Sequence, residues 1–276
     1  MTASGVSGHF IQGAKGPLFV LLRRPPGDVR GCVLVLPPFA EEMNKCRRMV
    51  TEVCAGLAQC GVASLVVDLY GTGDSGGDLS DADWATWQDD VSVAVKWAAS
   101  KGLPIQRLLA LRLGCALAAS CAERGDLPGL RTSVFWQPVF NGGRVLSQFL
   151  RLRVAASAME QDRKESLAEL RDQLNQGRLV EVAGYSLGRG LATSLERILP
   201  AQVLPQALGD LTWVELVRED GVAIGAESRQ ILDANLARDG GMMLQTFVGP
   251  PFWASTEIVS LPDVVASTVE RLCQEP

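Results

Sequence analysis

Residues 184–188 read GYSLG, which is the G-x-S-x-G pattern of a serine nucleophile placed on a tight turn between a strand and a helix. A serine hydroxyl attacks a carbonyl only when a neighbouring base accepts its proton. The chain has one histidine, His9, and none follows Ser186. Five-residue matches also arise readily by chance in a chain with 28 glycines. The sequence therefore predicts that Ser186 is a loop or helix-start residue and not a nucleophile.

Composition limits the classes of function that remain. The 276 residues are 47% hydrophobic and 21% charged, which is typical of one globular domain with room for an insertion. The net charge of −5 is spread over mixed signs, so nucleic acid is not an expected partner. The N-terminus lacks the pattern of a signal peptide, and no run of about 18 apolar residues occurs, so we expect no transmembrane segment and a cytoplasmic protein.

The seven cysteines fit neither a disulfide framework nor metal-ligand spacing. We expect reduced thiols, mostly in the core, with no metal site and no cofactor.

The pattern of strands and helices predicts the fold that positions the candidate residues. After a predicted opening hairpin, short apolar runs typical of buried strands alternate with helix-like segments. Such alternation predicts a doubly wound, mostly parallel α/β sheet. The expected strands cover residues 32–39, 64–71, 107–114, 132–140, 211–217 and 242–249.

The alternation breaks between the fourth and fifth of these strands. Residues 144–205 have helical periodicity with mixed charge, which predicts a helical insertion over one end of the sheet. The core then comprises residues 1–143 and 206–276.

Three segments together resemble the α/β-hydrolase superfamily. DLYGTGDSGG (68–77) matches the turn after that family's fourth strand, LPPFAEEMN (36–44) stands at its oxyanion-forming loop, and ALRLG (110–114) stands at its nucleophile elbow. More narrowly, these segments together with VEVAGY (180–185) are similar to the group called exosortase A system-associated hydrolase 2. That group accompanies bacterial PEP-CTERM sorting and exopolysaccharide machinery. The resemblance implies an ester or thioester hydrolase whose insertion, residues 144–205, is a lid.

The same resemblance shows where this sequence departs from the family. In the small-x-nucleophile-x-Gly pattern, Ala110 and Gly114 take the small positions and Arg112 takes the nucleophile position. An arginine stays protonated and cannot attack a carbonyl. The loop after the last strand reads VGPPFWASTE (248–257) and has no histidine. Asp220 aligns with the family's acid, and we interpret Cys115 as a packed helix residue.

The candidate site residues therefore differ from a Ser-His pair. Arg112 would stand at a helix N-terminus and favour an anionic group, or it would form an internal ion pair; its possible partners are Glu41, Glu42, Asp220 and Glu257. Glu41 or Glu42 could activate a water as a general base, or form a solvated, salt-bridged helix start. The backbone N–H of Phe39 could face a substrate oxygen. The expected pocket also includes Leu113, Trp136, Gln137 and Trp253.

Two functions follow from these residues. One is a hydrolase in which a carboxylate, rather than a Ser-His pair, activates water. The other is a noncatalytic binding or partner module with a degenerate catalytic triad, which binds an anionic or acylated small molecule or a sister hydrolase. The missing nucleophile and the missing histidine favour the second.

Overall fold

The computed structural model describes residues 5–158, 165–199, 203–235 and 241–274. Within these residues an eight-stranded sheet has the order β1-β2-β4-β3-β5-β6-β9-β10. The opening hairpin and its pairing with β4 are antiparallel, and all other pairings are parallel. The strands are β1 (Gly5–Gln12), β2 (Pro17–Arg24), β3 (Cys32–Leu36), β4 (Ala63–Val67), β5 (Ile105–Leu111), β6 (Thr132–Trp136), β9 (Asp210–Val217) and β10 (Met242–Val248). The predicted doubly wound, mostly parallel sheet is confirmed.

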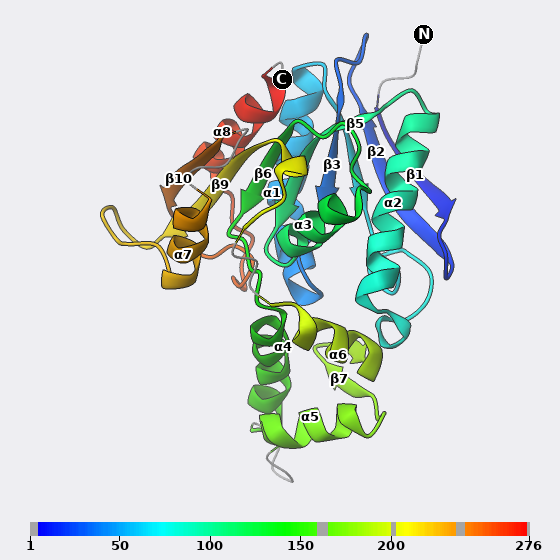
Figure 1. Cartoon of the computed structure of the whole chain (residues 1–276), viewed down its shortest axis with the longest axis vertical. Coiled ribbons are helices and arrows are strands. Elements are labelled where there is room, and N and C mark those ends of the chain that lie inside the picture. The colour runs from blue at the N-terminus through cyan, green and yellow to red at the C-terminus, as the bar shows by residue number, and fades with distance from the viewer. Residues whose placement is uncertain (1–4, 159–164, 200–202, 236–240, 275–276) are drawn as a thin grey trace.

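Helices cover both faces of this sheet (Figure 1). Alternate residues of the central strands point to opposite faces, so Leu34 packs toward α2, α3 and α7, whereas Val33 and Val35 pack toward α1 and α8. Because both faces are covered, the central strands are mostly apolar on both faces. The five helices are α1 (Glu41–Gln59), α2 (Trp84–Ser100), α3 (Gly114–Arg124), α7 (Ala226–Ala234) and α8 (Pro262–Cys273).

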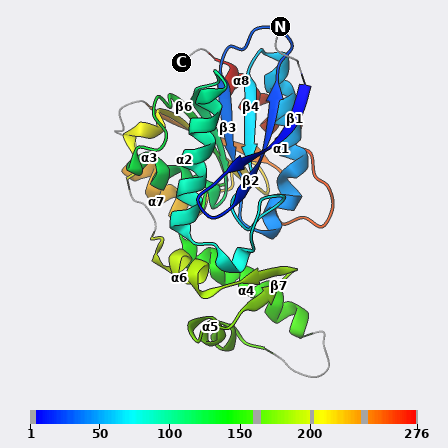
Figure 2. The ribbon, with the colours of Figure 1, turned by 90° about the vertical axis from the view of Figure 1, so that its right-hand side faces the viewer.

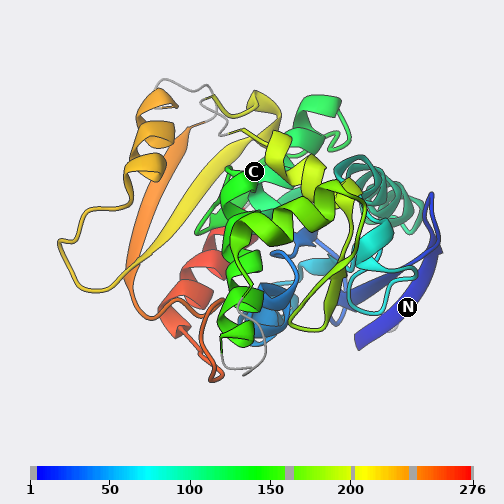
Figure 3. The same cartoon turned by 90° about the horizontal axis from the view of Figure 1, so that it is seen from below.

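The segment between β6 and β9 lies at the carboxyl ends of the strands. Figures 1 and 2 show it below the sheet, and Figure 3, seen from below, shows its helices across that end of the molecule. Its described elements are α4 (Gly142–Ser157), α5 (Leu167–Asn175), β7 (Val180–Val182), β8 (Tyr185–Leu187), α6 (Arg189–Arg197) and the 3₁₀ helix η2 (Gln206–Leu208). We call the part from α4 to α6 the cap. Of the range 144–205, residues 159–164 and 200–202 lie outside the described residues.

The turn after β4 is fixed by side chains. Ser75 Oγ donates to the Asp68 carbonyl oxygen at 2.5 Å and accepts from Phe19 N–H at 2.8 Å. Asp68 Oδ2 accepts from the Asp74 N–H at 2.9 Å. Gly73 has a φ of 54°, and a Cβ there would lie 2.0 Å from Asp68 Oδ2, so only glycine fits. The turn leads through the 3₁₀ helix η1 (Leu79–Asp81) into α2.

Candidate functional site

Three loops at the carboxyl ends of strands contain a residue with a strained backbone. Ala40, Arg112 and Gln137 follow β3, β5 and β6 and have φ values of 47°, 53° and 43°. Residues other than glycine rarely have positive φ, and such conformations concentrate at functional sites. The carboxyl ends of neighbouring parallel strands share one edge of the sheet, which brings these residues together.

The turn from β5 to α3, which we call the elbow, has Arg112 at its apex. The Arg112 N–H donates to the Trp136 carbonyl oxygen at 3.0 Å, and the Arg112 carbonyl oxygen accepts from Val139 N–H at 3.2 Å. A Cβ on Gly114 would lie 2.6 Å from the Pro37 carbonyl oxygen. Positive φ at the apex and close packing at the glycine are the backbone features that expose a residue at a strand-to-helix elbow. Here the side chain that the apex presents is a guanidinium.

The Arg112 side chain is held on several sides. Its Nε and Nη2 donate to Glu42 at 3.1 to 3.3 Å. Nη1 donates to the Gln137 carbonyl oxygen at 3.3 Å, and the guanidinium carbon lies 4.6 Å from the ring centre of Trp253. Of the four acids that could neutralise Arg112, the structure selects Glu42.

The two carboxylates at the start of α1 have different environments. Burial raises the pKa of Glu42 above the ordinary range of a carboxyl, and Arg112 opposes that shift. Glu41 instead pairs with Lys45, one turn along the helix, at 3.6 Å. The predicted salt-bridged helix start therefore describes Glu41, whereas Glu42 belongs to the Arg112 cluster.

A pocket of about 290 Å³ opens beside the Arg112–Glu42 pair. The core contributes Phe39 and Trp253, and the cap contributes apolar side chains of α4. We call this cavity the Arg112 pocket, and its lining residues are Phe39, Glu41, Glu42, Lys45, Arg112, Val145, Gln148, Phe149, Leu152, Trp253 and Ala254. Phe39 meets Phe149 edge to face, with ring centres 5.0 Å apart. The pocket therefore combines an apolar wall with two ion pairs.

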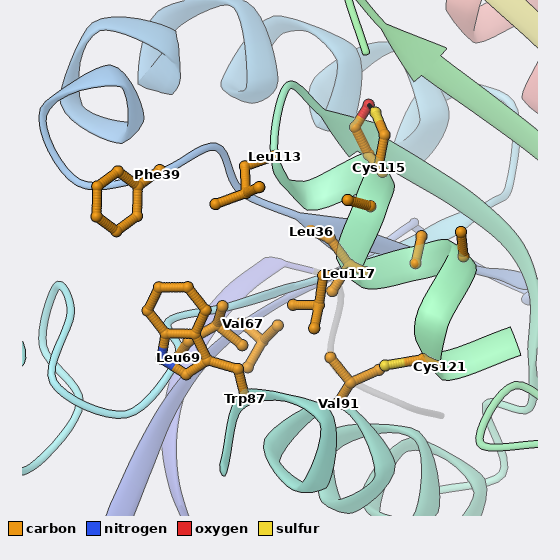
Figure 4. Close-up of a cluster of buried hydrophobic side chains, with 14 of the residues drawn as sticks. Leu36, Phe39, Val67, Leu69, Trp87, Val91, Leu113, Cys115, Leu117 and Cys121 are labelled. Atoms are coloured by element: carbon orange, nitrogen blue, oxygen red, sulfur yellow. Dashed lines mark hydrogen bonds between the residues drawn. The ribbon is translucent and has the colours of Figure 1, made fainter. Parts of the chain in front are cut away.

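Phe39 and Leu113 also line a second, smaller crevice beside the elbow. Figure 4 shows both side chains in one buried cluster with Trp87. Among the residues that the structure describes, neither backbone N–H has a hydrogen-bond partner. These N–H groups can donate to the oxygen of a ligand.

A buried carboxylate that sequence reasoning missed acts on the elbow apex indirectly, through Gln137. Glu215 on β9 accepts from Trp213 Nε1 at 2.9 Å and from Gln137 Nε2. Gln137 Oε1 accepts from Leu216 N–H at 2.7 Å. This network fixes Gln137, whose carbonyl oxygen holds Arg112. A glutamate inside the otherwise apolar run LTWVELV was the available signal, because a buried charge requires partners.

The fold has relatives among solved structures. A structure of Est1E from Butyrivibrio proteoclasticus with bound ferulic acid matches with a TM-score of 0.67 and 15% identity, over 96% of this chain and 100% of that one. The α/β hydrolase GrgF from Penicillium sp. sh18 matches with a TM-score of 0.63 and 15% identity, over 97% of each chain. The serine hydrolase XC6422 from Xanthomonas campestris, described as lacking a lid, matches with a TM-score of 0.57 and 13% identity, over 100% and 99%.

The chain has the α/β-hydrolase fold. At these identities the likeness extends to the fold alone. No protein-family model matches the chain, and no curated protein sequence matches it.

Within the α/β-hydrolase fold, the other candidate residues lie apart from the elbow. Ser186 is part of β8, which pairs with β7 as a small antiparallel hairpin, so it is neither a loop residue nor a helix start. His9 is on β1, at the edge of the sheet, where its Nε2 contacts Ser7 Oγ. Asp220 and Glu257 are exposed, and no contact joins either to Arg112 among the described residues. The catalytic role of Asp220 stays a prediction.

Cys115 is buried behind the elbow, and its thiol donates to the Ala110 carbonyl oxygen at 3.3 Å. Burial raises the pKa of the Cys115 thiol far above its usual range, which suppresses the reactive thiolate. Trp136 is also buried, against Phe252, and does not line the Arg112 pocket.

In the described part of the chain, no group of three His, Cys, Asp or Glu side chains is placed to hold a metal ion. No described helix has the length and apolar character to cross a membrane.

Proposed function

We propose that this protein is a binding module on an α/β-hydrolase fold, and that the Arg112 pocket holds a small molecule with an anionic end and an apolar or acyl body. One observation carries the proposal. The elbow retains its strained backbone, but its apex presents Arg112, which can bind an anion and cannot act as a nucleophile.

The pocket supplies contacts for both ends of such a ligand. Arg112 has five N–H donors, and its bonds to Glu42 and Gln137 leave one donor each on Nη1 and Nη2. The backbone N–H of Phe39, a residue that lines this pocket, adds one more donor. Rings of Phe149 and Trp253 offer an apolar surface. The structural neighbour Est1E is recorded with ferulic acid, a carboxylic acid on an aromatic body, which supports this class of ligand.

The wider context comes from the sequence resemblance. We propose that the protein works in the cytoplasm with the exosortase A, PEP-CTERM and exopolysaccharide system, where a sister hydrolase is a candidate partner. The range 144–205 would serve as the lid of the pocket, since Val145, Phe149 and Leu152 on its helix α4 line that pocket.

Titration with ferulate tests the binding proposal. Wild type should bind ferulate, whereas the uncharged methyl ferulate should bind about tenfold more weakly, because it lacks the charge-assisted hydrogen bond to Arg112. Arg112→Gln should remove this preference for the anion. Arg124→Gln, at the far end of α3, serves as the control and should preserve it. Equal affinity of both ligands for wild type would refute the proposal.

A second function is favoured by Glu42. Its carboxylate lines the pocket, and burial raises its pKa, which strengthens it as a base. A hydrolase using Glu42 to activate water should cleave methyl ferulate or short and long acyl-thioesters, and Glu42→Gln should abolish the turnover. Absence of turnover across that panel, with ferulate still bound, would leave the binding module.

A further inference from the structure

The strand β2 is apolar on both faces, although only one face is fully covered. Leu18, Val20 and Leu22 are buried in the core beneath α2 and α3. The alternate residues Phe19 and Leu21 point toward α1 and remain partly exposed. Such residues on an incompletely covered sheet face define the side of a groove.

Helix α1 lies beside the strands β2 and β4 (Figure 2), and the groove between them has a volume of about 160 Å³. It is separate from the Arg112 pocket because α1 presents different faces to the two. Met43, Cys46 and Val50 are spaced three and four residues apart and line the groove, whereas Glu41, Glu42 and Lys45 line the Arg112 pocket. The groove is lined by Phe19, Leu21, Arg23, Val35, Pro37, Pro38, Met43, Cys46, Arg47, Val50, Thr51, Cys54, Ser64, Val66, Asp68 and Asp74.

One end of the groove carries a hydroxyl and a cation that lack strong partners. Ser64 is 1% exposed, and its Oγ has no hydrogen-bond partner in the described structure beyond the thiol of Cys54, a weakly bonding group. Arg23 stands opposite Ser64 in the sheet register, and it has no ion-pair partner among the described residues. A buried hydroxyl without a good partner is costly, and a ligand oxygen would satisfy it.

The other end of the groove has a different charge. Asp68 and Asp74 stand there with Arg47, so acids outnumber the cation, whereas Arg23 is the charged group beside Ser64. Ser64 and Asp68 are four residues apart along the β4 direction, which corresponds to about 13 Å of extended chain. An anion would therefore bind at the Ser64 end, and an apolar chain would extend along Leu21 and Val66.

We infer that this groove binds a medium-chain alkyl carboxylate, with the carboxylate on Arg23 and Ser64 and the alkyl chain between β2 and α1. This site is additional to the Arg112 pocket and does not depend on the function proposed for it. Binding places the chain against Val50 and Met43 and removes apolar surface of β2 from water.

Calorimetric titration with decanoate tests the inference. Wild type should bind one decanoate in the groove, and Arg23→Gln should weaken that binding about tenfold through the loss of a charge-assisted hydrogen bond. Arg24→Gln is the matched control, because Arg24 is the next residue of β2, lies on the opposite face and donates to the Lys101 carbonyl oxygen. Its affinity should equal that of wild type. Ser64→Ala should weaken binding less than Arg23→Gln.

Three further measurements test whether decanoate occupies this groove and no other part of the molecule. Leu21→Trp, at a partly exposed wall, should block decanoate while its thermal unfolding stays cooperative. In an Arg112→Gln background, where the Arg112 pocket lacks its cation, decanoate should still bind and Arg23→Gln should still weaken that binding about tenfold, so failure of the ferulate test does not decide this one. Decanol, which has the same chain without the charge, should bind about tenfold more weakly than decanoate. Equal loss in Arg23→Gln and Arg24→Gln, equal binding of decanol, or loss only in Arg112→Gln would overturn the inference.

Discussion

The elbow at Arg112 and the hairpin of β7 and β8 divide the features of a nucleophile site between them. The elbow has the strained apex, the close glycine and the position at the carboxyl end of a central strand, but its side chain is a cation. The hairpin has the G-x-S-x-G sequence, but Ser186 pairs with Glu181 across a two-stranded ladder. One region therefore retains the geometry without the nucleophile, and the other has the serine without the geometry.

The difference shows that backbone context decides what such a motif means. At the elbow, the neighbours of Arg112 are set by three central strands packed on both faces. At the hairpin, Ala183 and Gly184 both have positive φ, as a tight two-residue turn requires. Gly184 therefore permits the tight turn of the hairpin, whereas Gly114 permits close packing of α3 against the end of β3 at the elbow.

Alanine substitution of one glycine in each region should separate these two roles most strongly. Gly114→Ala would place a Cβ 2.6 Å from the Pro37 carbonyl oxygen and 2.8 Å from that of Leu36, and should cost about 3 kcal/mol. Gly184→Ala meets no atom within 4 Å and should cost only about 1 kcal/mol for its positive φ. Urea unfolding of both variants measures the difference, and similar costs would contradict the close packing inferred for the elbow.

A third region, the turn after β4, has both its sequence motif, DLYGTGDSGG, and the tight turn that this motif predicts. Asp90 on α2 binds this turn and provides a test by pH. Asp90 accepts from Tyr70 N–H at 2.8 Å, and burial raises its pKa to about 6. The unfolded value is near 3.8, so the folded state binds the proton more tightly. The stability that protonated Asp90 contributes is therefore fully present below pH 3.8 and is lost as the pH rises from about 3.8 through about 6.

Wild type should therefore lose about 2 kcal/mol relative to Asp90→Asn between pH 4 and pH 6. Denaturant unfolding of both proteins across this range measures the effect. Other carboxyls titrate in the same window, and the comparison between the two proteins removes their contribution. Parallel pH profiles would show that Asp90 titrates normally.

The ion pair at the elbow should give a smaller effect. Glu42→Gln leaves Arg112, whose side chain is 10% exposed, without a carboxylate, and should cost about 1.5 kcal/mol. The neighbouring variant Glu41→Gln is the matched control. It removes only the surface pair with Lys45 and should cost less than about 0.5 kcal/mol. Thermal unfolding distinguishes them, and equal costs would mean that Arg112 does not depend on Glu42.

Much of the scaffold could be predicted from sequence, because it depends on local patterns. The apolar runs predicted the strands, and the small residues Ala110 and Gly114 predicted Arg112 at the apex. The predicted strand 32–39 was too long. β3 ends at Leu36, because Pro37 and Pro38 have no N–H to donate to a neighbouring strand.

The partner of Arg112 could not be predicted in the same way. Four acids were available, and the choice depends on how α1 begins. Ala40 has a φ of 47°, and this backbone geometry starts α1 so that Glu42, rather than Glu41, meets the guanidinium. Such a long-range orientation leaves no local sequence pattern. The hairpin is different, because the alternation in VEVAGYSL around a central Ala-Gly is a local signal for two paired strands, and the prediction of Ser186 as a loop or helix-start residue did not use it.

The hairpin serine should give the smallest effect of all. Ser186 is half-buried and makes no side-chain hydrogen bond among the described residues, so Ser186→Ala should change the free energy of unfolding by less than about 0.5 kcal/mol. Ser194→Ala in the same cap is the control for loss of a hydroxyl, and it removes a bond to the Gly190 carbonyl oxygen.

Reaction with a fluorophosphonate probe makes this last comparison decisive. The cross-strand neighbour of Ser186 is Glu181, and the one histidine of the chain lies on the distant edge strand β1, so no imidazole is placed to activate the hydroxyl. Wild type, Ser186→Ala and Ser194→Ala should all remain unlabelled. Labelling of wild type that disappears only in Ser186→Ala would reverse the comparison, because the cap hairpin would then be the reactive region and Arg112 a residue that supports it.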